Sequence, residues 1–429
     1  MCMDDKVIKP KHSHLISTLV AILLVLAVLA LGTLYAQSLE DKYVGVLAPL
    51  MLPQSNAGSA LQQAGFQQPD LLMVYGSSEM LVEDVPMTLT YGTATKILFE
   101  SSPYGASQFF KSYPTGFNVY EIAKGGAYSL DIAQDLAAIG PELRGKKVVF
   151  SFTPSMFNEP EVTQLAYAAD FSLLHANALI FNTQLSFETK QIAAQRMNDY
   201  PDTLKPDLVL QFGVQQLTCQ CWYGSYLYDL TVPLGQLDTQ IIRLQDHWAV
   251  MNYVWSHPNL NPQVVRKPQQ ISWSREISQA VISAKMDSNN NPYGIPNESW
   301  NAYFSKILAH RRRLGSADPG FVQRLNDSKE WEDFDLVLRI LKEMGAQPVI
   351  LSRPIDGPIW SAMGLSPLGR QAYYIKLQNA VSPYGFPYID FANHDGDRYF
   401  SIDPGSHTNR EGWVYVDQAL NAFFHGGVR

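Results

Sequence analysis

The sequence predicts an α/β fold, a doubly wound parallel sheet with a helical insertion, preceded by one N-terminal transmembrane helix. Short apolar runs alternate with amphipathic helical segments near both ends of the chain, which is typical of a parallel sheet. Between about residues 159 and 288 helical spacing continues without a clear strand pattern, which indicates the insertion. A long apolar run near the N-terminus indicates the membrane helix.

The apolar run extends from Leu15 to Leu39 without Asp, Glu, Lys or Arg. About 20 apolar residues cross the hydrocarbon core of a bilayer, whereas the apolar region of a cleaved signal peptide has about 7–15. The best cleavage point follows Ala36, but Leu34 stands where a small residue is expected. We therefore predict an uncleaved anchor at residues 15–36.

Basic residues beside this anchor predict its orientation. Three lysines precede it, Lys6, Lys9 and Lys11, and no Lys or Arg follows it until Lys42. The positive-inside rule then places residues 1–14 in the cytoplasm and residues 37–429 outside. We expect a single-pass cell-membrane protein with an extracytoplasmic domain.

Five apolar runs are predicted as strands of the sheet. They lie in the segments LLMVYG, GFNVYEIA, Lys147–Phe152, Pro348–Arg353 and Phe386–Phe391. Amphipathic helices are predicted in SLDIAQDLAAI, in EWEDFDLVLRILKEM before Gly345, in LGRQAYYIKLQNAV and in REGWVYVDQALNAFF.

Composition excludes some classes of function. The formal net charge is −8, which argues against nucleic acid as a partner. Cys2 precedes the anchor, whereas Cys219 and Cys221 follow it and either form a disulfide or remain two thiols. One such pair is too small a ligand set for zinc, and we find neither a metal-ligand cluster nor a glycine-rich phosphate loop. No cofactor is expected.

Polar and glycine-rich turns follow the first three predicted strands. They are Ser77–Ser78, Gly125–Gly126 and Thr153–Pro154. Sites in open α/β sheets lie beyond the carboxyl ends of the strands, so these turns are expected to meet there. A serine in this place is more often a helix cap than a nucleophile, and Met80 excludes the Gly-x-Ser-x-Gly elbow of α/β-hydrolases.

A serine nucleophile needs a neighbouring base, most often histidine. Of seven histidines beyond the anchor, only His394 and His407 follow a late strand. His407 has Asp403 four residues before it, and a carboxylate near a histidine can hold its tautomer. His394 lies in an Asn-His-Asp-Gly run that is more simply a solvated turn.

Taken together, these segments resemble the D-alanyl transfer protein (DltD) family, a membrane-anchored branch of the SGNH (GDSL-like) hydrolases. The resemblance covers nearly the whole chain. The matching segments are YGSSEM, AKGGAYSL, TPSMF, YGIPNESW and HTNREGWVYVDQ, and the last is the most specific.

The resemblance implies a role for each site residue. Ser78 matches the nucleophile and Ser77 the Asp position of the superfamily's Gly-Asp-Ser. His407 matches the general base. Backbone N–H groups of Ser78 and Gly126, in the turn begun by Gly125, are expected to form an oxyanion hole, where a lost donor raises the barrier by about 3–4 kcal/mol.

Two positions depart from the family pattern. The family spaces its acid and base as Asp-x-x-His, but Pro404 occupies that acid position. Either the loop bulges to bring Asp403 to His407, or His407 lacks a close acid, or Asp390 substitutes for it. Ser155 stands where the family has a glutamine whose amide could donate a hydrogen bond, and we expect Ser155 in the substrate-binding site.

The resemblance implies extracytoplasmic O-acyl transfer of D-alanine to a cell-envelope polymer such as teichoic acid, through a serine acyl-enzyme. The implied partners are a membrane-bound O-acyltransferase (DltB-like) and an acyl carrier system. One alternative is an acetyl transferase or esterase acting on another exported polysaccharide. A second is a non-catalytic accessory of the membrane acyltransferase.

The aromatic segment CQCWYGSYLY admits three interpretations. Its Trp and Tyr side chains could lie at the bilayer interface, contact a partner or fill the core. Filling the core is the expectation we adopt.

Overall fold

The computed structural model describes residues 12–51, 58–80, 87–89, 95–97, 103–159, 161–262, 264, 266–405 and 407–428. Residues 1–11 of the predicted cytoplasmic tail are not among them. Cys2 and the three lysines before the anchor therefore lie outside the described residues.

A five-stranded parallel sheet lies at the centre of the domain, in the order β4-β1-β5-β6-β7. The strands are β1 Leu71–Gly76, β4 Asn118–Ala123, β5 Lys147–Phe152, β6 Gln347–Ser352 and β7 Tyr388–Ile389. All five predicted strands are therefore confirmed. A short antiparallel pair, β2 Met87–Leu89 and β3 Thr95–Ile97, was not predicted and stands apart from this sheet.

Successive residues of the strands enter two different cores, as expected for a sheet covered on both faces. In β1, Met73 and Tyr75 join the larger cluster, which α4 (Ser129–Ile139) and α15 (Glu330–Met344) complete. Leu72 and Val74 join the smaller cluster on the other face. Helices α3 (Ala106–Ser112) and α18 (Arg410–Phe424) complete that cluster. The doubly wound fold is thus confirmed.

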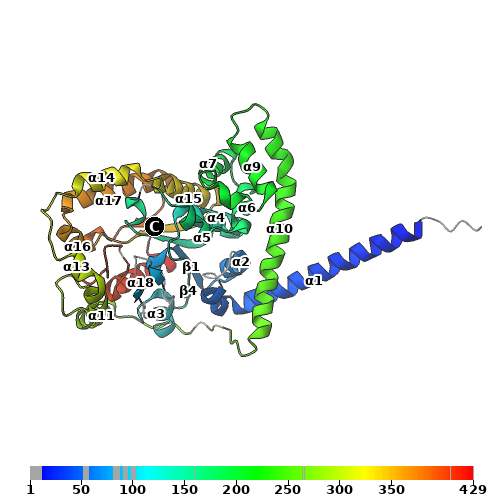
Figure 1. Ribbon diagram of the computed structural model, residues 1–429. Coiled ribbons are helices and arrows are strands. Elements are labelled where there is room, and N and C mark those ends of the chain that lie inside the picture. The colour runs from blue at the N-terminus through cyan, green and yellow to red at the C-terminus, as the bar shows by residue number, and fades with distance from the viewer. Residues whose placement is uncertain are drawn as a thin grey trace, which may run out of the picture.

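The described chain between β5 and β6 forms helices and loops only (Figure 1). These helices are α5 Gln164–Asp170, α6 Leu173–Ile180, α7 Phe187–Met197, α8 Pro201–Leu204, α9 Leu208–Thr218, α10 Gly224–Ser256, α11 Trp273–Asp287, α12 Asn297–Ser299, α13 Ser305–Ile307, α14 Asp318–Asp327 and then α15. After β6 come α16 Gly357–Ala362 and α17 Pro367–Val381, and α2 (Ser59–Gln67) precedes β1.

Helix α1 (His12–Met51) is long and apolar enough to cross a membrane, and it continues into the domain without a break. Most apolar side chains from Leu15 to Leu34 are exposed, whereas Ala36, Leu39, Val44 and Leu47 are buried. The last turns of α1 pack on α10 and α2, so the helix joins the domain rigidly (Figure 1).

A buried hydrogen bond joins α1 to α10. The Glu40 carboxylate lies 2.7 Å from Nδ1 of His247, and both side chains are buried. A polar group in the interior is tolerated when a hydrogen-bond partner contacts it. This contact therefore fixes the register of α1 against α10.

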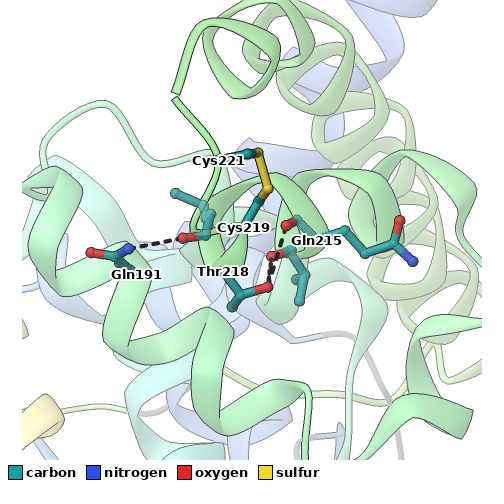
Figure 2. Close-up of a disulfide and its surroundings, with 7 residues drawn as sticks. Gln191, Gln215, Thr218, Cys219 and Cys221 are labelled. Atoms are coloured by element: carbon teal, nitrogen blue, oxygen red, sulfur yellow. Dashed lines mark hydrogen bonds between the residues drawn. A yellow bond between two sulfur atoms is a disulfide. The ribbon is translucent and has the colours of Figure 1, made fainter. Parts of the chain in front are cut away.

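Cys219 and Cys221 form a disulfide in the turn between α9 and α10 (Figure 2). The Gln191 side chain of α7 donates to the carbonyl oxygen of Leu217 beside this turn, at 3.1 Å. A Cβ on Gly224, the first residue of α10, would lie 2.9 Å from the backbone oxygen of Gln216. The start of α10 is therefore held closely against α9.

The expectation that the aromatic residues of CQCWYGSYLY fill the core is wrong for most of them. Tyr228 is buried and donates to the Ile180 carbonyl oxygen at 2.5 Å. Trp222, Tyr223 and Tyr226, by contrast, are 84%, 46% and 68% exposed. Most of this aromatic surface therefore faces outward.

Candidate active site

The carboxyl edge of the sheet brings together the polar turns predicted from the sequence. Ser77 and Ser78 follow β1, Gly125 and Gly126 follow β4, and Ser155 lies beyond β5. Because β4, β1 and β5 are neighbours, the three turns lie at one place. The Ser77 hydroxyl donates to the backbone oxygen of Lys124 at 3.3 Å, which ties the first two turns together.

Ser78, His407 and Asp403 form a continuous chain of hydrogen bonds. Nε2 of His407 lies 2.8 Å from Oγ of Ser78. Nδ1 of His407 lies 2.7 Å from Oδ2 of Asp403. With the Nδ1 proton held by the carboxylate, Nε2 is free to accept the serine proton, which is the arrangement of a Ser-His-Asp triad.

Asp403 reaches His407 because the loop folds back on itself past Pro404. The Asp403 carboxylate also accepts the backbone N–H of His407 at 3.3 Å. A Cβ on Gly405 would lie 3.2 Å from Oδ1 of Asp403 and 3.3 Å from the His407 ring, so a small residue favours this fold. Asp390 instead accepts the Tyr388 hydroxyl at 3.1 Å and the N–H of Ala392 at 2.9 Å.

Two side chains hold the loop that carries Asp403 and His407. The Ser155 hydroxyl donates to the backbone oxygen of Gly405 at 3.0 Å, and the Trp360 indole donates to that of Pro404 at 3.0 Å. Ser155 thus supports the loop of His407. Its expected contact with substrate stays a prediction.

The pair of His407 and Asp403 is electrostatically coupled. Burial disfavours the charged imidazolium, but the charge and hydrogen bond of Asp403 and the charge of Glu79 outweigh it, so the pKa of His407 is raised. Burial likewise opposes ionisation of Asp403, yet His407 and backbone donors lower its pKa. The carboxylate therefore remains charged while His407 titrates.

The turn that carries Ser78 is shaped by Gly76 and Glu79. A Cβ on Gly76 would lie 2.7 Å from Oε1 of Glu79 and 2.6 Å from Cγ of Met80, so glycine alone fits. The Glu79 carboxylate folds back to accept the backbone N–H of Ser77 at 3.1 Å. Glu79 is itself buried, so this carboxylate belongs to the interior beneath the turn.

Arg353, which is buried and directly follows β6, was not predicted from the sequence as part of the site. Its guanidinium is fully buried, lies 2.8 Å from Sδ of Met80 and stacks 5.3 Å from the centre of the Trp413 ring. Burial lowers the pKa of Arg353 to about 10, while Glu79 and Asp417 oppose that shift. The detectable signal was an arginine closing the otherwise apolar run PVILSR.

Arg353 supplies positive charge to two buried carboxyl groups. Burial raises the pKa of Glu79 and of Asp417, and the charge of Arg353 opposes both shifts. Glu79 in turn favours the protonated form of His407. A buried charge network therefore connects the turn of Ser78, the end of β6 and α18.

Gly126 has a positive φ of 88°, a backbone conformation that favours glycine. It lies with Gly125 in the turn after β4, beside the turn of Ser78. The described residues contain no group of three or more His, Cys, Asp or Glu side chains able to hold a metal ion.

Replacing Arg353→Met is expected to reduce the free energy of unfolding by about 3–5 kcal/mol, because Glu79 and Asp417 lose their buried counter-charge. Raised carboxyl pKa values stabilise the fold at low pH and cease to do so as pH rises through them. The loss should therefore be larger at pH 8 than at pH 5. Denaturant unfolding at both pH values measures it.

The double variant Glu79→Gln/Arg353→Met serves as the control and should regain part of the lost stability. Wild-type stability in the single variant at pH 8 would contradict this account of the network.

A family model described as "DltD protein" matches residues 48–425. The chain is 27% identical to Protein DltD of Bacillus subtilis (strain 168) over 391 residues, which is 91% of each chain. It is 23% identical to Protein DltD of Staphylococcus aureus (strain NCTC 8325 / PS 47) over 369 residues, covering 86% of this chain and 85% of that one. With the match spanning most of the fold and the whole described site, this chain belongs to the DltD protein family.

Proposed function

We propose that this chain is a serine-dependent acyltransferase of SGNH type, which transfers D-alanine outside the membrane to a polymer such as teichoic acid. The observation that carries the proposal is the hydrogen-bonded chain from Ser78 through His407 to Asp403. Membership of the DltD family supports D-alanine as the acyl group.

In the first half-reaction, Oγ of Ser78 attacks the carbonyl carbon of an activated D-alanyl ester or thioester. Nε2 of His407 takes the serine proton and returns it to the leaving group as the old acyl bond breaks. The negative charge on the carbonyl oxygen is held by the N–H groups of Ser78 and Gly126.

In the second half-reaction, a hydroxyl group of the acceptor replaces the leaving group. His407 takes its proton, the new ester bond forms, and Oγ of Ser78 departs with that proton. Asp403 stays ionised throughout and stabilises the imidazolium. Because the acyl group arrives activated, no nucleotide is needed.

The membrane placement is part of the proposal. We take α1 as an uncleaved anchor with its N-terminus in the cytoplasm. A cut after Ala36 would divide a continuous helix whose next turns are buried in the domain, which favours an anchor over a signal sequence. The disulfide of Cys219 and Cys221 suits an oxidising, extracytoplasmic compartment. A membrane-bound O-acyltransferase and a carrier system would deliver the acyl group.

Asp170 favours an aminoacyl group over an acetyl group. A Cβ on Gly126 would lie 4.0 Å from Oδ2 of Asp170, so this carboxylate borders the predicted oxyanion hole. Burial raises its pKa to about 6 against the charge of Lys124, so the group is ionised at neutral pH. It is placed to attract the ammonium group of an alanyl donor, which an acetyl group lacks.

Ser78→Ala is expected to abolish polymer acylation, because no other group of the triad can carry the acyl chain. Fluorophosphonate labelling of the full-length protein should be lost in this variant and retained in the matched control Ser77→Ala. Mass spectrometry locates the label. Full polymer acylation by Ser78→Ala would exclude both enzymatic functions and favour the accessory alternative.

Asp403→Asn is expected to lower the rate by about 10³–10⁴-fold, because the wrong tautomer of His407 is then favoured. In the wild type, activity should rise with pH through a midpoint above 6.5, because only neutral His407 accepts a proton. Without the Asp403 charge, the midpoint should move to lower pH. A pH profile of acylation measures both effects, and an unchanged midpoint would contradict the coupling.

Asp170→Asn is expected to raise the KM for a D-alanyl thioester about tenfold and leave the KM for the matched acetyl thioester unchanged, as a loss of about 1.4 kcal/mol in binding would do. Wild-type affinity for the D-alanyl donor should also fall below pH 6, as Asp170 becomes protonated. Equal effects on both thioesters would argue for the acetyl transferase alternative.

A further inference from the structure

The outer face of α10 carries a continuous apolar stripe. Six side chains between 48% and 73% exposed form it: Tyr226, Leu230, Leu234, Leu237, Ile241 and Trp248. Their spacing of three, four and seven residues places them on one face of the helix. Trp255 extends the stripe to the last turn and is also exposed. Contiguous exposed apolar side chains of this kind mark surfaces that contact a protein or a membrane.

The opposite face of α10 forms the contact with the domain. It buries Tyr228, Gly235, Thr239, Asp246 and Val250. The charged residues of α10 all lie outside the stripe, in a helix that has three aspartates and one arginine. The helix is thus apolar toward the outside and polar or buried elsewhere, which is the pattern of helices that lie in a membrane interface.

The crossing of α1 and α10 shows what lies against the stripe. In Figure 1, α10 runs across α1, and α1 leaves the domain on the side that α10 covers. The Trp255 indole donates to the Tyr35 hydroxyl at 3.4 Å, and their rings lie 6.3 Å apart. About 20 residues cross the hydrocarbon core, which from Leu15 reaches Leu34. The crossing with α10 therefore falls at the outer boundary of the bilayer.

We propose that α10 lies in the outer interface of the membrane, with its apolar stripe at the boundary between lipid head groups and acyl chains. The inference rests on α1 as the membrane anchor, proposed above, and does not depend on catalysis. It assigns the stripe to lipid because the spanning segment of α1 brings the bilayer to the outer side of α10.

The side chains of the stripe suit this depth. Tyr226 stands near one end, Trp248 and Trp255 stand near the other, and aliphatic residues lie between them. Trp and Tyr are enriched at membrane interfaces, where an apolar ring and a polar group are both accommodated. Because α10 carries little positive charge, its attachment is hydrophobic and should not need anionic lipid.

Spin labels on the full-length protein test this placement. Labels at Leu230→Cys and Leu237→Cys, in a Cys2→Ser background, are reconstituted in phosphatidylcholine vesicles with and without phosphatidylglycerol. Val25→Cys in α1 serves as the lipid control. Ile282→Cys in α11, an exposed apolar position 59% accessible, serves as the aqueous control. Relaxation by oxygen and by a water-soluble nickel chelate reports whether each label contacts lipid.

We expect the labels at 230 and 237 to collide severalfold less often with the nickel chelate than the label at 282 does. They should also collide more often with oxygen, and both results should hold in both lipid mixtures. Nickel access at 230 and 237 equal to that at 282, with Val25→Cys in lipid, would overturn the inference and leave the anchor intact. Protection that requires an added membrane acyltransferase would also overturn it, in favour of a protein partner.

A charged variant provides a second measurement. Leu234→Glu/Leu237→Glu changes only exposed side chains, so circular dichroism should match the wild type. The label at 230 should then gain nickel access while the label at 25 stays in lipid. Unchanged lipid contact at 230 in this folded variant would argue against the stripe as the attachment.

Discussion

The hydrogen bond between Ser78 and His407 joins two residues that are 329 positions apart in the chain. It can form only when β1 and the last strands have joined one sheet, because Ser78 follows β1 and His407 lies in the loop after β7. The loops bearing the two residues are then fixed separately, by Gly76 and Glu79 on one side and by Ser155 and Trp360 on the other. Local contacts therefore position each of the two residues, although the hydrogen bond between them spans most of the chain.

The buried charges beneath the site also lie at the carboxyl edge of the sheet. Arg353 is buried where β6 ends and partly neutralises Glu79 and Asp417. Taking such charges out of water is costly, and the opposite charge of Arg353 offsets part of that cost for both carboxyl groups. Glu79 contacts the backbone of Ser77 and raises the pKa of His407. The network thus influences both the shape of the turn that carries Ser78 and the protonation of His407.

Much of this arrangement could be predicted from the sequence, and the reasons are physical. Buried parallel strands are continuous apolar runs, so LLMVYG and KVVFSF were recognisable without tertiary information. The pairing of Ser78 with His407 was indicated by the resemblance to the DltD family, because spacing alone does not separate a nucleophile from a helix cap. The choice between Asp403 and Asp390 was open, because a loop that folds back on itself has no local pattern. The charge network of Arg353 was missed because its members meet only through the topology.

The outward aromatic residues after Cys221 show a similar limit. An apolar residue on a helix predicts burial, but the sequence does not say whether protein or lipid covers it. For α10, only its crossing with α1 indicates whether the exposed face of the helix contacts water or lipid. The same pattern of apolar residues can therefore belong to a helix face that protein covers or to one that lipid covers.

The unbroken passage of α1 into the core has a consequence for how substrates meet the site. A domain held on a flexible linker must lose rotational freedom at each encounter. With α1 as the anchor proposed above, this domain would lose that freedom once, on insertion, because α1 continues into the core without a break. Ser78 would then stay at a nearly constant height above the lipid. Under the proposed function, donor and acceptor groups tethered in the same membrane would search only across a plane, and groups held at another height would be excluded by geometry alone.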